Sequence, residues 1–537
     1  MNRRNFVERV ALTSGTALAA ATAQATEAAT GTATTASFDV TEKTVAQLQD
    51  AMRAGAVSSQ QLVQLYLARI AALDKAGPKL HSIIELNPEA LAIAKALDAE
   101  RKVKGPRGPL HGIPVLLKDN IATADAMQTT AGSLALVGAK PPRDAFLVSQ
   151  LRDAGAVILG KTNLSEWANM RSTRSTSGWS ARGGLTKNPY ALDRNTSGSS
   201  SGSGSSMAAS LATIAVGTET DGSITSPSSL AGLVGIKPTV GLVSRAGVVP
   251  ISHSQDTAGP MCRTVADAAA LLTVLAGTDP RDSATALANQ KKADYTQVLD
   301  RHALKGKRLG VVRGQWAAAS DIVAAAIEAQ LAVLIAQGAT LIDVPEVPNA
   351  NKYGDSELTV LLYELKADLN AYLAEYAPTA KVKTLADLIA FNEAHRNQEM
   401  GYFGQEHFIN AQSKGDLNTA EYRDALANNH RYARAEGIDQ VLQEHQLDAL
   451  VAPTGGTAWL TDFINGDAYG SSFTSPAAVA GYPHITVPAG LVRGLPVGLS
   501  FVGTAWTESA LIAMAYAYEQ ASLQRKPPTY AKSVNMK

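Results

Sequence analysis

The chain of 537 residues contains one cysteine, Cys262, so no intramolecular disulfide can form. Its nine histidines show no H-x-H or H-E-x-x-H spacing, and no C-x-x-C pair occurs. We therefore expect no metal site and no cofactor. The 48 basic residues equal the 48 acidic ones, which leaves no positive excess to attract nucleic acid or an anionic membrane.

The N-terminus carries features of a twin-arginine export signal. Paired arginines in Asn2-Arg-Arg-Asn-Phe-Val7 precede a weakly apolar stretch, and small-residue cleavage sites follow at Ala21-Thr-Ala23 and Ala23-Gln-Ala25. The apolar stretch falls short of the roughly 20 residues that a membrane span requires. We predict a signal peptide over 1–25, a flexible segment over 26–37 and export to the periplasm or medium, without membrane insertion of the mature form. The alternative is a disordered tail.

The remaining chain alternates helical and strand patterns. Apolar residues make up 45% of the chain, enough for a large core. Predicted helices cover 62–73, 145–154, 265–276 and 322–337, and predicted strands cover 115–117, 156–159, 309–312 and 340–344. This alternation favours an α/β fold with a mainly parallel sheet covered on both faces. Residues 350–446 are polar and mostly helical, most clearly over 357–376, and we interpret them as a cap around the site.

Two serines and a lysine indicate a nucleophilic site that uses no histidine. Ser199 lies in the Gly/Ser-rich segment 196–206, Ser223 lies in Gly217-Thr-Glu-Thr-Asp-Gly-Ser-Ile224, and Lys118 ends the apolar run Gly112-Ile-Pro-Val-Leu-Leu-Lys118. A serine hydroxyl needs a base within hydrogen-bond reach, and a lysine kept neutral by burial is such a base. The second serine can relay the proton.

Other interpretations of these residues stay open. Segment 196–206 has the composition of a flexible linker, but apolar segments flank it on both sides, which favours a glycine-rich active-site loop. Gly198-Ser-Ser-Ser-Gly202 matches G-x-S-x-G, which would make Ser200 the nucleophile of a Ser-His-Asp esterase, yet the polar stretch 188–195 before it is not the required strand. Lys161 also ends a predicted strand and is an alternative base.

The order of these segments is similar to that of the amidase signature family. The matching blocks are 112–120, 198–200, 217–224, 232–239, 256–260, 481–488 and 494–503. They span nearly the whole predicted domain, residues 38–531. The resemblance implies a single α/β/α domain with a large mixed, mainly parallel central sheet covered by helices. Within the family, the resemblance is greatest to bacterial peptide amidases, in segments 217–223, 177–180 and 465–467.

The resemblance also implies roles for individual residues. It makes Ser223 the nucleophile, Ser199 the bridging serine and Lys118 the base, with a cis peptide bond between Gly198 and Ser199. The oxyanion hole would consist of backbone N–H groups from Thr220, Asp221, Gly222 and Ser223. Desolvation is expected to lower the pKa of Lys118 from about 10.4 toward roughly 7–8.

Three positions depart from the family pattern. Glu219 replaces the usual Asp and Asp221 the usual Gly, so a carboxylate lies beside the expected oxyanion hole, which survives if that side chain points away. Thr225 stands where many relatives carry Arg, which argues against a substrate with a free carboxylate beside the scissile bond. Ser226-Pro227 predicts the N-cap and first residue of a helix whose N-terminus adds positive potential.

The resemblance implies hydrolysis of a carboxamide C–N bond through an acyl-enzyme, with C-terminally amidated peptides as the expected substrates. Candidates for lining the substrate groove are Ser200, Trp179, Trp459 and Phe463. Aliphatic, aryl and fatty amides stay open as substrates. Two alternatives to a hydrolase stay open: an inactive binding protein and an amidotransferase subunit. We expect a monomer that acts on a small-molecule or peptide amide.

Overall fold

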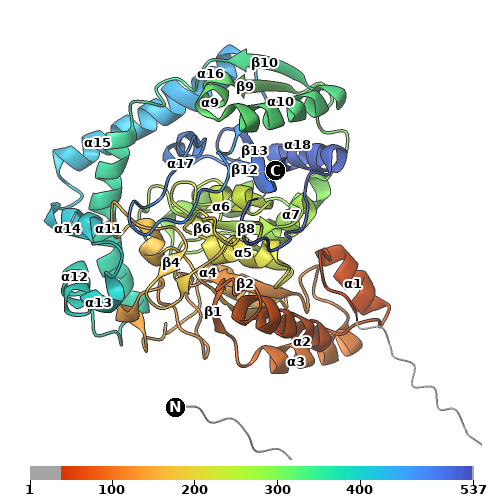
Figure 1. The fold of residues 1–537 in the computed structure, drawn as a ribbon, viewed down its shortest axis with the longest axis vertical. Coiled ribbons are helices and arrows are strands. Elements are labelled where there is room, and N and C mark those ends of the chain that lie inside the picture. The colour runs from red at the N-terminus through yellow and green to blue at the C-terminus, as the bar shows by residue number, and fades with distance from the viewer. Residues whose placement is uncertain (1–37, 535–537) are drawn as a thin grey trace, which may run out of the picture. The chain divides into compact units, whose positions relative to one another are not determined.

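An eleven-stranded mixed sheet forms the centre of the fold in the computed structural model, which describes residues 38–534 (Figure 1). In spatial order the strands are β1 (Ile83–Leu86), β3 (Val157–Thr162), β2 (Pro114–Lys118), β6 (Ile214–Glu219), β8 (Thr257–Cys262), β7 (Val234–Lys237), β12 (His484–Val492), β13 (Leu495–Val502), β11 (Ala449–Pro453), β9 (Arg308–Val312) and β10 (Thr340–Val344). A separate two-stranded sheet pairs β4 (Trp179–Ser180) with β5 (Gly184–Leu185).

Parallel pairing occurs in two blocks of the large sheet. Strands β3, β2 and β6 form one block, and β11, β9 and β10 form the other. The strands between these blocks pair antiparallel, and so do β1 and β3. The mixed sheet of an α/β fold is confirmed; of its ten neighbouring strand pairs, four are parallel and six antiparallel.

Strand β2 shows why the apolar runs become central strands. Its consecutive residues Val115, Leu116 and Leu117 are all fully buried. Since successive side chains of a strand point to opposite faces, both faces of the sheet are covered at this strand. The strand ends at Lys118, as the sequence predicted.

Helices surround this sheet. They are α1 (Val45–Arg53), α2 (Ser59–Arg69), α3 (Ala90–Lys104), α4 (Phe146–Asp153), α5 (Ser201–Ala208), α6 (Thr225–Leu230), α7 (Val265–Leu275), α8 (Ala288–Lys291), α9 (Arg313–Ala318), α10 (Asp321–Ala336), α11 (Gly354–Tyr376), α12 (Leu385–Ala394), α13 (Arg396–Glu399), α14 (Glu406–Ser413), α15 (Ala420–His430), α16 (Asp439–Glu444), α17 (Ser475–Ala480) and α18 (Glu508–Ser522). The predicted helices 145–154, 265–276 and 322–337 are confirmed as α4, α7 and α10. None of the helices among residues 38–534 has the length and apolarity that a membrane crossing would require.

Helix α2 begins one turn earlier than the predicted range 62–73. The Ser58 hydroxyl accepts from the Gln61 backbone N–H, and the Gln61 side chain accepts from the Ser58 N–H, which forms a capping box. After Arg69 the chain continues as a π-helical segment over Ile70–Lys75. The Ser58 cap therefore marks where this helix starts.

The cap region is helical, as predicted. Helix α11 packs against α14 and α15, and Figure 1 shows these helices together with α12 and α13 on one flank. The predicted helix 357–376 corresponds to α11, which starts three residues earlier. The predicted signal peptide (1–25) and the segment 26–37 lie outside the described residues.

Candidate active site

Lys118 and Ser199 meet in the interior of the protein. The Lys118 Nζ donates to the Ser199 Oγ at 2.7 Å and to the Thr218 Oγ1 at 2.8 Å, and neither Lys118 nor Ser199 is exposed to solvent. Lys118 is the last residue of β2, and Thr218 lies on the neighbouring β6. Adjacent strands therefore present the amine to the serine.

The surroundings of Lys118 favour its neutral form. Burial lowers the pKa of Lys118 from 10.5 to about 7, and the negative charges of Asp256 and Glu219 offset part of this drop. A lysine with such a pKa is partly an unprotonated amine at neutral pH and can take a proton from a hydroxyl.

The loop that carries Ser199 approaches its neighbours closely. The Gly198–Ser199 peptide bond is cis, which confirms the prediction. A Cβ atom at position 198 would lie 2.1 Å from the Ser165 Oγ, so only glycine fits there. The Ser200 N–H donates to the Ser223 carbonyl at 3.2 Å, which ties this loop to the one that carries Ser223.

Ser223 lies in residues 220–224 between β6 and α6, which we call the nucleophile loop after the role predicted for Ser223. Gly222 has a φ of +75°, a conformation that favours glycine. Within the described part of the chain, the backbone N–H groups of Asp221, Gly222 and Ser223 donate to no protein acceptor. These donors stand beside a serine that is 7% exposed, so they are available to an oxygen bound there.

The start of helix α6 differs from the prediction. The helix begins at Thr225, so the prediction of an N-cap at Ser226 is wrong. Instead, the Glu219 carboxylate accepts from the Ile224 N–H at 2.8 Å and the Thr225 N–H at 2.9 Å. A side chain from the end of β6 thus satisfies the first N–H groups of the helix, and no serine cap is needed. Glu219 also holds the end of the nucleophile loop.

Asp221 turns its carboxyl group to partners outside the nucleophile loop. Its Oδ2 accepts from the Ser475 hydroxyl at 2.6 Å. Burial raises the pKa of Asp221, and burial together with the nearby Asp221 raises the pKa of Glu357 to about 8. Burial and the neighbouring Asp221 thus favour the protonated form of Glu357 at neutral pH. This arrangement limits the charge that faces the free N–H groups.

The two alternative site residues lie in other environments. The Ser200 hydroxyl donates to the Thr218 carbonyl and accepts from the Thr218 N–H, so it holds β6 in place. The Lys161 Nζ donates to the Ile121 carbonyl at 2.6 Å and to the Thr129 hydroxyl at 2.9 Å. Neither side chain makes a hydrogen bond to Ser199 or Ser223 within the described residues.

The predicted groove residues form two aromatic groups. Trp179 and Phe463 both contact Tyr402, with ring centroids 5.5 and 4.1 Å apart. Trp459 contacts Tyr469 at 4.7 Å, and the Tyr469 hydroxyl lies 3.2 Å from that of Ser197. The second group therefore reaches the loop that carries Ser199.

Asp467 organises this second group. It accepts from the Ser177 N–H at 2.9 Å, and from the Asn195 Nδ2 and the Trp459 Nε1, each at 3.2 Å. Asp467, Thr218 and Asp256 lie in segments that resemble the family, but their sequence context indicates no specific role. Tyr469 has no distinguishing sequence signal.

Comparisons with known proteins agree on one family. The Amidase family model matches residues 61–512. The structure of native peptide amidase from Stenotrophomonas maltophilia is 52% identical, with a TM-score of 0.86 over 91% of this chain and 99% of that chain. A probable amidase of Arabidopsis thaliana is 44% identical over 503 residues, 92% of each chain. A glutamyl-tRNA(Gln) amidotransferase subunit of Halorhodospira halophila is 36% identical over 491 residues, 90% of this chain and 97% of that one.

Proposed function

The chain belongs to the amidase signature family and hydrolyses an amide bond, and on this basis we propose that it is a peptide amidase with a Ser223–Ser199–Lys118 relay. The observation that carries the proposal is the 2.7 Å contact between the Lys118 amine and the Ser199 hydroxyl. It joins a buried lysine of lowered pKa to a serine whose loop contacts the backbone of Ser223.

The first half of the reaction forms an acyl-enzyme. Neutral Lys118 takes the proton of Ser199 while Ser199 takes that of Ser223, and the Ser223 Oγ attacks the amide carbonyl carbon. Negative charge develops on the carbonyl oxygen, and the free N–H groups of Asp221, Gly222 and Ser223 can stabilise it, with the Thr220 N–H as the fourth predicted donor. As the C–N bond breaks, the relay runs backwards and protonates the amide nitrogen, which leaves as ammonia.

The second half hydrolyses the acyl-enzyme. Water gives a proton to the same relay and attacks the ester carbonyl carbon, and collapse of the intermediate releases the carboxylic acid and regenerates the Ser223 hydroxyl. Every proton moves through residues of the chain itself.

C-terminally amidated peptides are the proposed substrates. The supporting observations are the similarity to a peptide amidase over 91% of the chain and the absence of an arginine at Thr225 for a substrate carboxylate. Similarity to an amidotransferase subunit is lower, at 36% identity. Such a subunit works with partners, so ammonia release by the isolated protein separates the two functions.

The test is ammonia release by purified protein from amidated dipeptides, aliphatic amides and anilides. We expect the highest kcat/KM with the amidated dipeptides. Ser223→Ala is expected to abolish turnover with unchanged thermal unfolding, since it removes only the attacking oxygen, while Ser200→Ala keeps turnover. Full activity of Ser223→Ala would refute the nucleophile, and loss of activity only in Ser200→Ala would support the esterase-type alternative.

We also propose export, which rests on the arginine pair and the cleavage-like sites of the first 25 residues. Exchange of both Arg3 and Arg4 for lysine should leave the protein in the cytoplasm of the producing cell. Unchanged distribution after fractionation would contradict a twin-arginine signal.

A further inference from the structure

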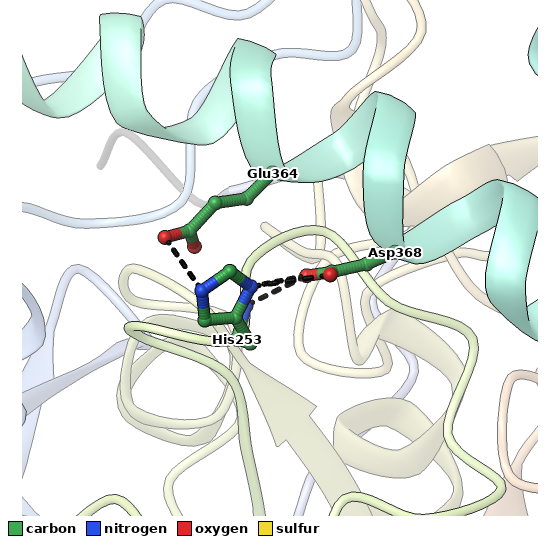
Figure 2. A group of neighbouring side chains, drawn as sticks. All are labelled: His253, Glu364 and Asp368. Carbon is green, nitrogen blue, oxygen red and sulfur yellow. Dashed lines mark hydrogen bonds and ion pairs between the residues drawn. The ribbon is translucent and has the colours of Figure 1, made fainter. Parts of the chain in front are cut away.

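His253 lies between two carboxylates of helix α11 (Figure 2). Its Nε2 is 3.1 Å from a Glu364 oxygen, and its Nδ1 is 2.9 Å from an Asp368 oxygen. His253 belongs to the segment 251–256 that precedes β8, so the contacts join this segment to the cap helix. The site assigned above does not include any of the three residues.

One ligand atom of each of these three side chains lies within 4.8 Å of the others, close enough to hold a metal ion. Figure 2 shows, however, that each ring nitrogen already faces a carboxylate of its own. The Glu364 oxygens already accept from the hydroxyls of Ser252, Ser254 and Tyr422 and from the Ser254 N–H. The carboxylates of the cluster are therefore already paired with groups of the protein.

Two carboxylates beside the ring favour its doubly protonated form. The Nδ1 donates to Asp368, and Nε2 forms an ion pair with Glu364 when the ring is an imidazolium, whereas the neutral ring would place a lone pair beside a carboxylate. Other groups that face the ring are the Tyr422 hydroxyl of α15, 3.4 Å from Nε2, and the Arg245 guanidinium, which donates to the His253 carbonyl. The ring is 42% exposed, so it can exchange protons with solvent.

Electrostatics agree with this geometry. Burial lowers the pKa of His253, but the hydrogen bond to Asp368 and the charges of Glu364 and Asp368 outweigh it, so the pKa lies above the ordinary 6.5. The positive charge of Arg245 acts in the opposite direction.

Segment 251–256 also holds the nucleophile loop. The Asp256 carboxylate accepts from the Thr220 hydroxyl at 2.5 Å and from the Ile251 and Ser252 N–H groups. The Gln255 Nε2 donates to the Thr220 carbonyl at 3.3 Å and to Glu357 of α11 at 2.9 Å. Thr220 is the first residue of the nucleophile loop, so its position depends on a segment that is tied to α11 by His253 and also by Ser252, Ser254 and Gln255.

We propose that His253, as an imidazolium between Glu364 and Asp368, is a positioning residue that holds the nucleophile loop in its active geometry through segment 251–256. The proposal rests on the proposed function of this loop. Because the folded state raises the pKa of His253, the stabilising contact is complete below pH 6.5 and is lost as the pH rises through the folded-state pKa. Turnover should decline on the alkaline side for this reason.

The experiment compares wild type with His253→Gln, His253→Lys and Asp368→Asn, with the exposed His302→Gln as the control. Ammonia release from an amidated dipeptide gives kcat and KM between pH 6 and 10, and thermal unfolding gives Tm over the same range. His253→Gln should lower kcat about 10-fold at pH 6.5 with little change in KM, because a displaced loop affects the transition state most. It should also abolish the alkaline decline in kcat and Tm.

The other variants make the test specific to charge. His253→Lys should recover most of the kcat, and Asp368→Asn should move the alkaline decline to lower pH. The proposal fails if His253→Gln keeps the wild-type kcat and alkaline decline, or if His302→Gln has the same effect. If wild type releases no ammonia, the proposed function fails, but the dependence of Tm on His253 and pH still tests the contact. If His253→Gln does not fold, Asp368→Asn alone tests the proposal. An alkaline decline that stays at the wild-type pH in Asp368→Asn then refutes it.

Discussion

The buried amine of Lys118 leads to a quantitative prediction about pH. A lysine with the ordinary pKa of 10.5 is neutral in about one molecule in 3,000 at pH 7, whereas a pKa of about 7 leaves about half of the molecules neutral. Burial at the end of β2 therefore enlarges the fraction of active base by about a thousandfold. If Lys118 is the base, kcat/KM must rise about tenfold per pH unit below pH 7 and then level off until the alkaline decline proposed for His253 begins.

Two variants test whether Lys118 causes this fall of kcat/KM at low pH, which we call the acid limb. Lys118→Met removes the amine from a buried site and should lower kcat/KM by about 100- to 10,000-fold, with the residual activity independent of pH in this range. Asp256→Asn removes a negative charge that raises the pKa of Lys118, so the midpoint of the limb should move to lower pH whatever happens to the rate.

The assay is ammonia release from an amidated dipeptide between pH 5 and 9 at constant ionic strength. Circular dichroism and thermal unfolding at each pH show that the variants are folded. An acid limb that survives in Lys118→Met would assign the base to another residue. A wild-type midpoint above pH 9 would show that burial does not make this lysine a base at neutral pH.

Three further predictions concern neighbouring side chains. Lys161→Met should lower Tm, because Lys161 satisfies buried oxygens, but should keep the acid limb of kcat/KM; its disappearance would point to Lys161 as the base. Glu219→Ala should lower kcat about 10-fold at similar KM, because the N–H groups at the end of the nucleophile loop lose their acceptor. Glu219→Gln keeps an acceptor and should retain most of the rate. An equal loss of kcat in both variants would contradict this role of Glu219. Asp467→Ala should raise KM for amidated dipeptides but not for a small aliphatic amide, because Trp459 loses its hydrogen bond to Asp467. An equal change of KM for both substrates would place Trp459 outside the peptide site.

Sequence patterns predicted the elements of the fold well where periodicity is a local property. The apolar run before Lys118 became the buried strand β2, and the helical spacing over 322–337 became α10. The Ser58 cap of α2 is also a local feature, because capping joins residues that are three positions apart. The N-cap prediction failed at Ser226, because the Glu219 carboxylate at the end of β6 accepts from the first N–H groups of α6. No local sequence pattern reveals that contact.

The sequence by itself determined the residue types of the candidate site, the strand end that carries Lys118 and, through the order of its blocks, the family. Only the tertiary structure decided which of these side chains meet. The contacts of Lys118 with Ser199, of Asp256 with Thr220 and of His253 with α11 each join segments far apart in the chain. The depressed pKa of Lys118 has the same origin, because desolvation depends on the chain segments that pack around the amine and on the charges they bring near it.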